Sequence, residues 1–99
     1  MKVAANESLI HGTGLFTVDS VEQGEHIGTF EGEPVDEDDI HVLWHQEGDD
    51  WKGLSVSNVL KFANHSKSPN VEVVGRDMFA LKRIEIGEEI TFDYGEEWE

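Results

Sequence analysis

The sequence predicts a mainly β domain that is built from many short strands and contains little helix. Turn-forming stretches rich in Gly, Pro, Asn and Asp recur along the chain, among them "HGTG", "EQGE", "EGEP", "EGDD", "KSPN" and "EIGEE". The stretches between them are short and rich in β-branched and aromatic residues, which is typical of strands. In no window do apolar residues recur at the i, i+3, i+4 spacing of an amphipathic helix.

The expected strands follow one another in chain order. Residues 14–18, 26–30, 40–44 and 54–56 are predicted to form the first four. Residues 71–74 and 78–81 are predicted to be the two arms of a hairpin, with the turn near Gly75. The last strand is expected over residues 89–92. The stretch "VSNVLKF" before "NHSKSPN" has room for one helical turn.

Length and composition set the broad class of the protein. The 99 residues suit one domain, which we expect to extend over residues 1–99. There is no cysteine, which excludes disulfides and thiolate zinc sites. The sequence has no apolar run near the ~20 residues of a membrane-spanning helix, and "MKVAANESLIHG" lacks the apolar stretch of a signal peptide. We therefore expect a soluble cytoplasmic protein without a membrane partner.

The charge of the chain is strongly negative and unevenly placed. The net charge is −15, and the segment from Val3 to Trp51 holds thirteen acidic residues and no Lys or Arg. A nucleic-acid partner is not expected, because phosphate binding needs a basic surface. Two interpretations of the acid remain open. It either keeps the protein soluble or attracts a basic partner through a long-range field.

Several segments are candidate sites, although each also has a purely structural interpretation. "HGTG" is either a turn or a loop that lets backbone approach a ligand. His41 and His45 would lie ~13 Å apart on a strand, so we predict no metal site. Tyr94 and Trp98 follow the last strand, where a large ring near a chain end needs something to pack on. In "NHSKSPN", Asn64, Ser66 and Asn70 are expected to bond to local backbone in nested turns.

Taken in order, these segments resemble the SET domain, the fold of protein-lysine methyltransferases. The resemblance is carried by "GTGLF", "DSVEQGEHIGTFEGE", "LKFANHSKSPN" and "IEIGEEITFDYG", which cover nearly the whole chain in the right order and spacing. The chain resembles above all the minimal, single-domain SET proteins of microbes and viruses. The resemblance implies a β-clip-like fold of several small curved sheets, with a C-terminal pseudoknot that brings "NHS" beside "DYG".

The resemblance also implies a site for S-adenosyl-L-methionine. Backbone of the "HGTG" turn would line the methionine end of the cofactor, and Asn64 would bond to that amino-acid moiety. Backbone of His65 would bond to the adenine, and Trp98 would pack on it. Tyr94 would be the catalytic tyrosine at the point of transfer. The implied cofactor-binding residues are His11, Gly12, Thr13, Gly14, Asn64, His65, Tyr94 and Trp98.

The implied reaction is an in-line attack of a lysine amine on a sulfonium methyl, and it needs no metal. The reacting atoms must be aligned at about 3–3.5 Å. The amine must also be neutral, although free lysine has a pKa of about 10.4. An apolar channel and the nearby sulfonium both disfavour the ammonium. Phe30, Phe62 and Phe92 are the expected channel walls. The expected partner is a basic, lysine-containing protein substrate, with acidic residues around the mouth of the channel.

The sequence departs from the family pattern in three places. Phe30 stands where many members have a tyrosine, which removes one hydroxyl near the methyl group. "NHSK" replaces the commoner "NHSC", consistent with the absence of a zinc cluster. Only 31 residues separate Gly32 from Asn64, and this reduced insert suggests either loose selectivity or help from a partner subunit in a homodimer.

Two other functions are kept as alternatives to the enzyme. One is a SET-fold binding module that has lost activity, which Phe30 and the short insert would explain. The other is an acidic decoy or inhibitor that occupies a basic site of another protein, which the net charge would explain.

Overall fold

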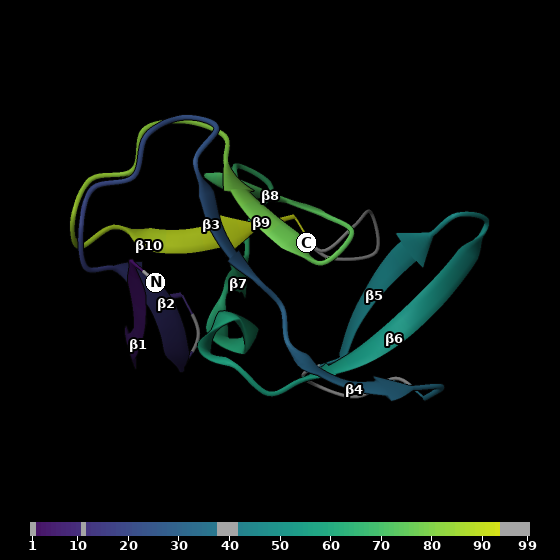
Figure 1. Ribbon diagram of the computed structural model, residues 1–99. Coiled ribbons are helices and arrows are strands. Elements are labelled where there is room, and N and C mark those ends of the chain that lie inside the picture. The colour runs from purple at the N-terminus through teal and green to yellow at the C-terminus, as the bar shows by residue number, and fades with distance from the viewer. Residues whose placement is uncertain (1, 11, 38–41, 94–99) are drawn as a thin grey trace.

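The computed structural model of the protein describes residues 2–10, 12–37 and 42–93. In these ranges the chain forms three small sheets and one short 3-10 helix (Figure 1). This confirms the prediction of a mainly β fold with little helix. The helix, η1 (Val59–Phe62), lies where one helical turn was expected, and no helix of the described residues is long and apolar enough to span a membrane.

The first sheet joins the two ends of the described chain. Its order is β1 (Val3–Glu7), β2 (Thr13–Thr17), β10 (Glu89–Phe92) and β7 (Asn64–His65). β1 and β2 form an antiparallel hairpin, and β10 pairs antiparallel with β2. On its other side β10 runs parallel to β7. Two parallel strands cannot be joined by a tight turn, so the chain between β7 and β10 must cross over before β10 can pair with β7.

The other two sheets each have three antiparallel strands. One has the order β3 (His26–Thr29), β9 (Asp77–Ala80) and β8 (Val71–Val74). The other has the order β4 (Gly32–Val35), β6 (Asp50–Val56) and β5 (Val42–Glu47). Figure 1 shows this third sheet extending away from the sheet that contains β10. The hairpin of β8 and β9 turns at Gly75, which has φ +63°, as the sequence predicts.

Three strands were not predicted. They are β1, β4 and the two-residue β7, which lies in a segment that was expected to be a loop of nested turns. β1 buries only Val3, so its sequence lacks the alternation that identifies a strand. The stretch "EGEP" was expected to be a turn, but its last three residues, Gly32 to Pro34, belong to β4. Pro34 is tolerated there because β4 is at the edge of its sheet. Gly32 is required because a Cβ would lie 1.8 Å from the backbone oxygen of Ser55 on β6.

One hydrophobic core connects the three sheets and η1. Leu15, Leu60, Met78, Ile84 and Ile90 are fully buried in it. In the third sheet, β6 buries Leu54 and Val56 in this core but leaves residues 50–52 exposed. The inner end of the third sheet is therefore anchored in the core, and its outer end lies in solvent.

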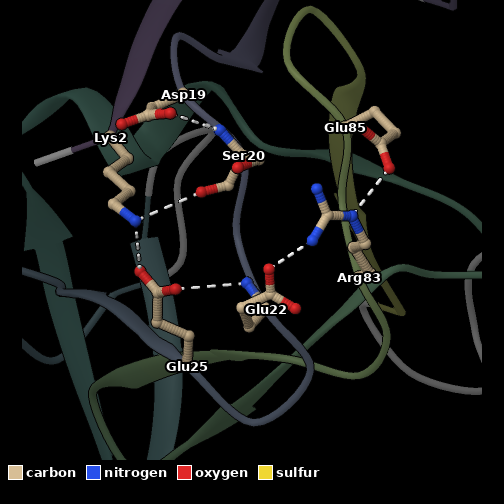
Figure 2. Close-up of polar contacts among 7 residues, drawn as sticks. All are labelled: Lys2, Asp19, Ser20, Glu22, Glu25, Arg83 and Glu85. Atoms are coloured by element: carbon tan, nitrogen blue, oxygen red, sulfur yellow. Dashed lines mark hydrogen bonds and ion pairs between the residues drawn. The ribbon is translucent and has the colours of Figure 1, made fainter.

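An ionic network covers the segment between β2 and β3 (Figure 2). Lys2 Nζ lies 3.1 Å from Glu25 Oε2 and donates to the Ser20 carbonyl at 3.1 Å. Arg83 contacts Glu22, and its Nε donates to Glu85 Oε1 at 2.8 Å. That second contact, with the charges of the two glutamates, raises the pKa of Arg83.

The network is exposed, and pairs of exposed charges stabilise folds little. A buried backbone contact attaches the segment between β2 and β3 to the chain near Ile84 more strongly. Val21 and Ile84 form a β-bridge there, both are fully buried, and backbone hydrogen bonds of 2.8 and 2.9 Å join them. In this network Lys2 and Arg83, two of the seven basic residues, form ion pairs with Glu25 and Glu22 of the segment.

Candidate functional site

The candidate site lies where β7 and β10 run side by side. Asn64 pairs with Thr91 and His65 pairs with Phe92, and Ser66 N donates to the Phe92 carbonyl at 3.2 Å. The "NHS" residues therefore lie beside "TFD" at the end of β10, immediately before position 94. Tyr94, Trp98 and His11 lie outside the described residues, so their expected roles stay predictions.

Asn70 connects the "NHSKSPN" segment to β10. Its Nδ2 donates to the Glu89 carbonyl at 2.8 Å, and its Oδ1 accepts from Thr91 N at 2.9 Å. Its own N–H donates to the Thr91 carbonyl at 3.2 Å. The prediction that this side chain bonds to local backbone was therefore wrong. A local turn is present at Ser66, whose Oγ accepts from Ser68 N at 3.0 Å.

A polar cluster joins β10 to β7 and to the loop after β1. The hydroxyl of Ser8 lies 2.8 Å from both carboxylate oxygens of Glu89, and Asn64 Nδ2 donates to Glu89 Oε2 at 2.8 Å. Asn64 Nδ2 also lies 3.2 Å from Ser8 Oγ and 3.5 Å from the Thr13 carbonyl. Ser8 Oγ further accepts from Ile10 N at 2.9 Å. Asn64 is thus neither a local turn residue nor exposed, since 8% of its surface is accessible.

The cluster determines the orientation of the Asn64 amide. A carboxylate and a carbonyl can only accept hydrogen bonds, so the group that faces them must be the NH₂ end of the amide. The amide oxygen then lies on the opposite branch of the side chain. Glu89 has no ion pair within the described part of the chain, so its carboxylate is held by the neutral donors of Ser8 and Asn64.

The glycines of "GTG" serve two different purposes beside this cluster. Gly12 has φ +44°, a conformation that favours glycine, and open space lies around the place where a Cβ would be. Gly14 is buried in β2, and a Cβ there would lie 2.5 Å from Glu89 Oε2 and 2.9 Å from Ser8 Cβ. Gly14 is therefore needed for the close approach of Glu89, whereas Gly12 leaves its backbone open to an approaching group.

Charged groups continue along the strand after the cluster. His65 Nδ1 lies 3.8 Å from Asp93 Oδ1, and Lys67 Nζ lies 3.2 Å from the same oxygen. The side chain of His65 is 11% exposed, whereas Asp93 and Lys67 are more accessible. These contacts hold the end of β10 against the "NHSK" segment, at the residue immediately before Tyr94 in the sequence.

Two of the three predicted channel phenylalanines lie together. The rings of Phe30 and Phe92 pack edge to face with centroids 6.3 Å apart. Phe30 is 2% exposed and belongs to the core, and Phe92 is partly buried against it. Phe62 also packs against the core, and Lys61 Nζ lies 5.2 Å from its ring centroid. The structure thus places an apolar pair, Phe30 and Phe92, at the end of β10, with Phe30 buried in the core.

Sequence reasoning gave no role to Ser8 or Glu89. Glu89 stands inside the quoted "GEEIT" pattern, but a strand residue followed by alternating apolar positions looks like an ordinary exposed position. Of the predicted histidine pair, His45 is buried in β5 and His41 lies outside the described residues. No group of three metal-binding side chains occurs among the residues that the structure describes.

The sequence of this chain is similar to those of several known proteins. The SET domain family model matches residues 12–95. The chain is 33% identical to the histone-lysine N-methyltransferase MEDEA of Arabidopsis thaliana, in an alignment that covers 94% of this chain and 16% of the relative. It is 30% identical to the histone-lysine N-methyltransferase mes-2 of Caenorhabditis elegans, over 88% of this chain and 14% of the relative.

A human relative, histone-lysine N-methyltransferase 2B, is 32% identical over 93% of this chain and 4% of its own length. The chain therefore spans a sixth or less of the length of these relatives. The alignment with the Arabidopsis protein is 116 residues long, which exceeds the 99 residues of this chain. That relative must carry residues within the aligned region that this chain lacks, in keeping with the short spacing between Gly32 and Asn64.

Proposed function

Because this chain belongs to the SET domain family, we propose that it is a protein-lysine N-methyltransferase that uses S-adenosyl-L-methionine. The observation that carries the proposal is the parallel pairing of β7 with β10, which places Asn64 and His65 beside the strand that leads to Tyr94. The related proteins described above are all histone-lysine N-methyltransferases, which supports the same reaction.

The residues around the Ser8–Asn64–Glu89 cluster fit the methionine end of the cofactor. The oriented Asn64 amide offers its oxygen to an ammonium group, and the open backbone at Gly12 and Thr13 offers further polar groups. In this proposal His11 and Gly14 complete the loop, and His65 backbone and the Trp98 ring take the adenine. When bound, the cofactor supplies an electrophilic methyl group on a sulfonium.

In this proposal the protein itself contributes the alignment of the lysine amine with the methyl group and an apolar surface that excludes water. With the cofactor bound, the lysine nitrogen would accept the methyl group and the sulfur would leave with the electrons of the broken carbon–sulfur bond. The lysine amine would first have to lose a proton to water. An ammonium is disfavoured beside the apolar Phe30–Phe92 wall, which lowers the pKa of a lysine held there. The Tyr94 hydroxyl, just beyond Asp93, orients the amine or the methyl group. In this proposal Phe62 forms a further wall.

The proposed substrate is a basic segment of a protein that contains the target lysine. The net charge of −15 favours the encounter with such a segment at low ionic strength. Carboxylates that attract an ammonium also stabilise it. The acidic residues that attract the substrate should therefore surround the site at a distance, and no carboxylate should lie against the Phe30–Phe92 pair.

Transfer of a labelled methyl group tests the proposal. The protein is incubated with labelled cofactor and a lysine-rich protein mixture, in parallel with the variant Tyr94→Phe. We expect label on substrate lysines with the unmodified protein and much less with the variant. Absence of transfer by the unmodified protein, or equal transfer by both, would contradict the catalytic assignment.

Calorimetry separates cofactor binding from catalysis. Asn64→Ala should weaken binding of S-adenosylhomocysteine by about 10-fold or more, because it removes a hydrogen bond to a charged group. Asn6→Ala is the matched control, since Asn6 is exposed and its Oδ1 accepts only from the neighbouring Glu7 N in the described structure. Equal affinity of the two variants would exclude the proposed role of Asn64.

One observation favours a second candidate, a binding module without activity. Phe30 is buried and carries no hydroxyl where many family members have one. If the protein binds S-adenosylhomocysteine but methylates no substrate in the mixture, the binding module is the better assignment. Salt-sensitive binding to a basic protein that is unaffected by Asn64→Ala would instead indicate the acidic decoy.

A further inference from the structure

The third sheet presents two tryptophans on one face. Trp44 of β5 pairs with Gly53 of β6, and Trp51 of β6 pairs with Gln46. Partners in an antiparallel pair point to the same face, and so do residues two apart on a strand. Trp44 and Trp51 therefore share a face. The positions of this "Trp face" on the three strands are Glu33, Val35, Val42, Trp44, Gln46, Trp51, Gly53 and Ser55.

The Trp face is the outer face of the sheet. The opposite register positions hold Leu54 and Val56, which are buried in the core, and His45, which is 6% exposed. Trp51 is 65% exposed and Trp44 is 38% exposed. A Cβ at Gly53 would lie 3.0 Å from the Trp44 ring, so the end of that ring packs closely against the glycine. The core therefore accounts for neither indole.

The sheet is also flanked by several carboxylates. Glu31, Glu33, Asp36, Glu37, Asp49 and Asp50 flank or belong to its strands, and none of them has an ion pair in the described part of the chain. Lys52 occupies a position of the opposite face, paired with His45. Residues 36–37 follow Val35, which pairs with Gly53, so they lie at the same end of the sheet as Trp51 and residues 49–50.

We propose that the Trp face binds a lysine- and arginine-rich segment of the protein substrate, away from the residue that is methylated. The proposal rests on the proposed function for the identity of the partner as a substrate. Indole rings attract Lys and Arg cations over their faces, and the flanking carboxylates add attraction of the same sign. A second copy of this chain is not favoured as the occupant, because both copies would present the same acidic sheet.

This surface is separate from the β7–β10 site. Figure 1 shows the third sheet projecting away from β10 and β2, and the Trp face is turned away from the core that β10 helps to form. A substrate that contacts both places must span them with several residues. The expected consequence is that long basic substrates gain affinity over short peptides centred on one lysine.

Fluorescence anisotropy of a labelled peptide of alternating Lys, Arg and Ala, without cofactor, tests the surface directly. Trp51→Ala should weaken binding by about two- to five-fold, the range expected for one exposed cation–π contact. Trp51→Leu should lose nearly as much, because it is apolar but lacks the ring, and Trp51→Phe should lose less. Circular dichroism of each variant confirms that the sheet is intact.

Two matched controls make the result specific. Ile86 is 66% exposed and lies outside the third sheet, so Ile86→Ala should leave the affinity unchanged. Glu33→Gln on the Trp face should weaken binding and reduce its salt dependence more than Glu72→Gln on β8, which removes the same charge elsewhere. Equal losses in Trp51→Ala and Ile86→Ala, or unchanged binding in every Trp51 variant, would overturn the proposal.

Sedimentation analysis addresses the second copy. A dimer that Trp51→Ala dissociates, together with unchanged peptide binding, would also overturn the proposal. In methylation assays, Trp51→Ala should raise KM for a long basic substrate, leave kcat unchanged, and leave a short single-lysine peptide unaffected. If the unmodified protein binds the basic peptide through Trp51 but transfers no methyl group, the surface stands as a binding site and the proposed enzyme function fails.

Discussion

Asn70→Ala is the substitution whose effect the tertiary structure defines most sharply. The Asn70 side chain is 7% exposed and closes two hydrogen bonds to the backbone of β10, at 2.8 Å to the Glu89 carbonyl and at 2.9 Å from Thr91 N. Alanine removes both partners and leaves the backbone of β10 in place. The Thr91 N–H and the Glu89 carbonyl then have no partner from this side chain, and Thr91 is buried away from water.

The cost follows from the two orphaned groups. Each buried polar group without a partner costs about 1–3 kcal/mol. Thr91 is buried, and Glu89 is half-buried, so its carbonyl recovers some hydration. We expect a loss of about 3 kcal/mol in the free energy of unfolding. That is a large part of the ~5–15 kcal/mol of a typical domain, and it corresponds to a fall in Tm of about 12–24 °C.

Guanidinium denaturation followed by circular dichroism measures this loss. Asn70→Asp should lie between the unmodified protein and Asn70→Ala, because it keeps an acceptor for Thr91 N but places a second oxygen against the Glu89 carbonyl. The exposed Asn6→Ala serves as the control for loss of an asparagine side chain. A loss below about 0.5 kcal/mol in Asn70→Ala would refute the assignment of Asn70 as the connection to β10, since that is the range of neutral surface changes.

Two further predictions concern crowding and charge. Gly14→Ala places a Cβ 2.5 Å from Glu89 Oε2, so the carboxylate must move away from Asn64. We expect the free energy of unfolding, measured by denaturation, to fall by about 1–3 kcal/mol, and S-adenosylhomocysteine to bind more weakly. Unchanged stability and affinity would contradict this prediction. The pKa of Asp77 is lowered from 3.8 by hydrogen bonds from the Thr29 hydroxyl and from His26. Ionised Asp77 therefore stabilises the fold above its ordinary pKa, and the contribution is lost as pH falls through the lower value of the folded state. Asp77→Asn should flatten the dependence of the denaturation midpoint on pH below 4, and an unchanged slope would argue against the contact.

The predicted strands that the structure confirms best are those with strong local signals. The hairpin of β8 and β9 has β-branched residues in its first arm and a glycine of positive φ in its turn, and β8 occupies residues 71–74 as expected. The last strand, β10, also has the expected bounds. β1 was missed because its sequence lacks alternation, and β4 because it contains proline. β7 was missed because it is only two polar residues long and is a strand solely through its pairing with β10.

The candidate site was predictable only in part. Asn64 and His65 were identified from a resemblance, and their position beside β10 agrees with what it implies. Glu89 and Ser8 were not identified, since their contact joins positions 81 residues apart. Asn70 was recognised as a polar turn residue, yet its main hydrogen bonds reach 19 and 21 positions along the chain. Short polar side chains bond equally well to near and distant backbone, so type alone does not identify their partner.

The sequence by itself determined the class of the fold, the acidic character and the family, because turn residues, strand alternation, charge and ordered motifs are properties of local composition and order. The tertiary structure decided the orientation of the Asn64 amide, the use of Gly14 to admit Glu89, and the placement of Trp44 and Trp51 on one outer face. These features depend on register between strands, where a slip of one residue exchanges the two faces. Register is set by packing of the whole chain and appears only when the strands are paired.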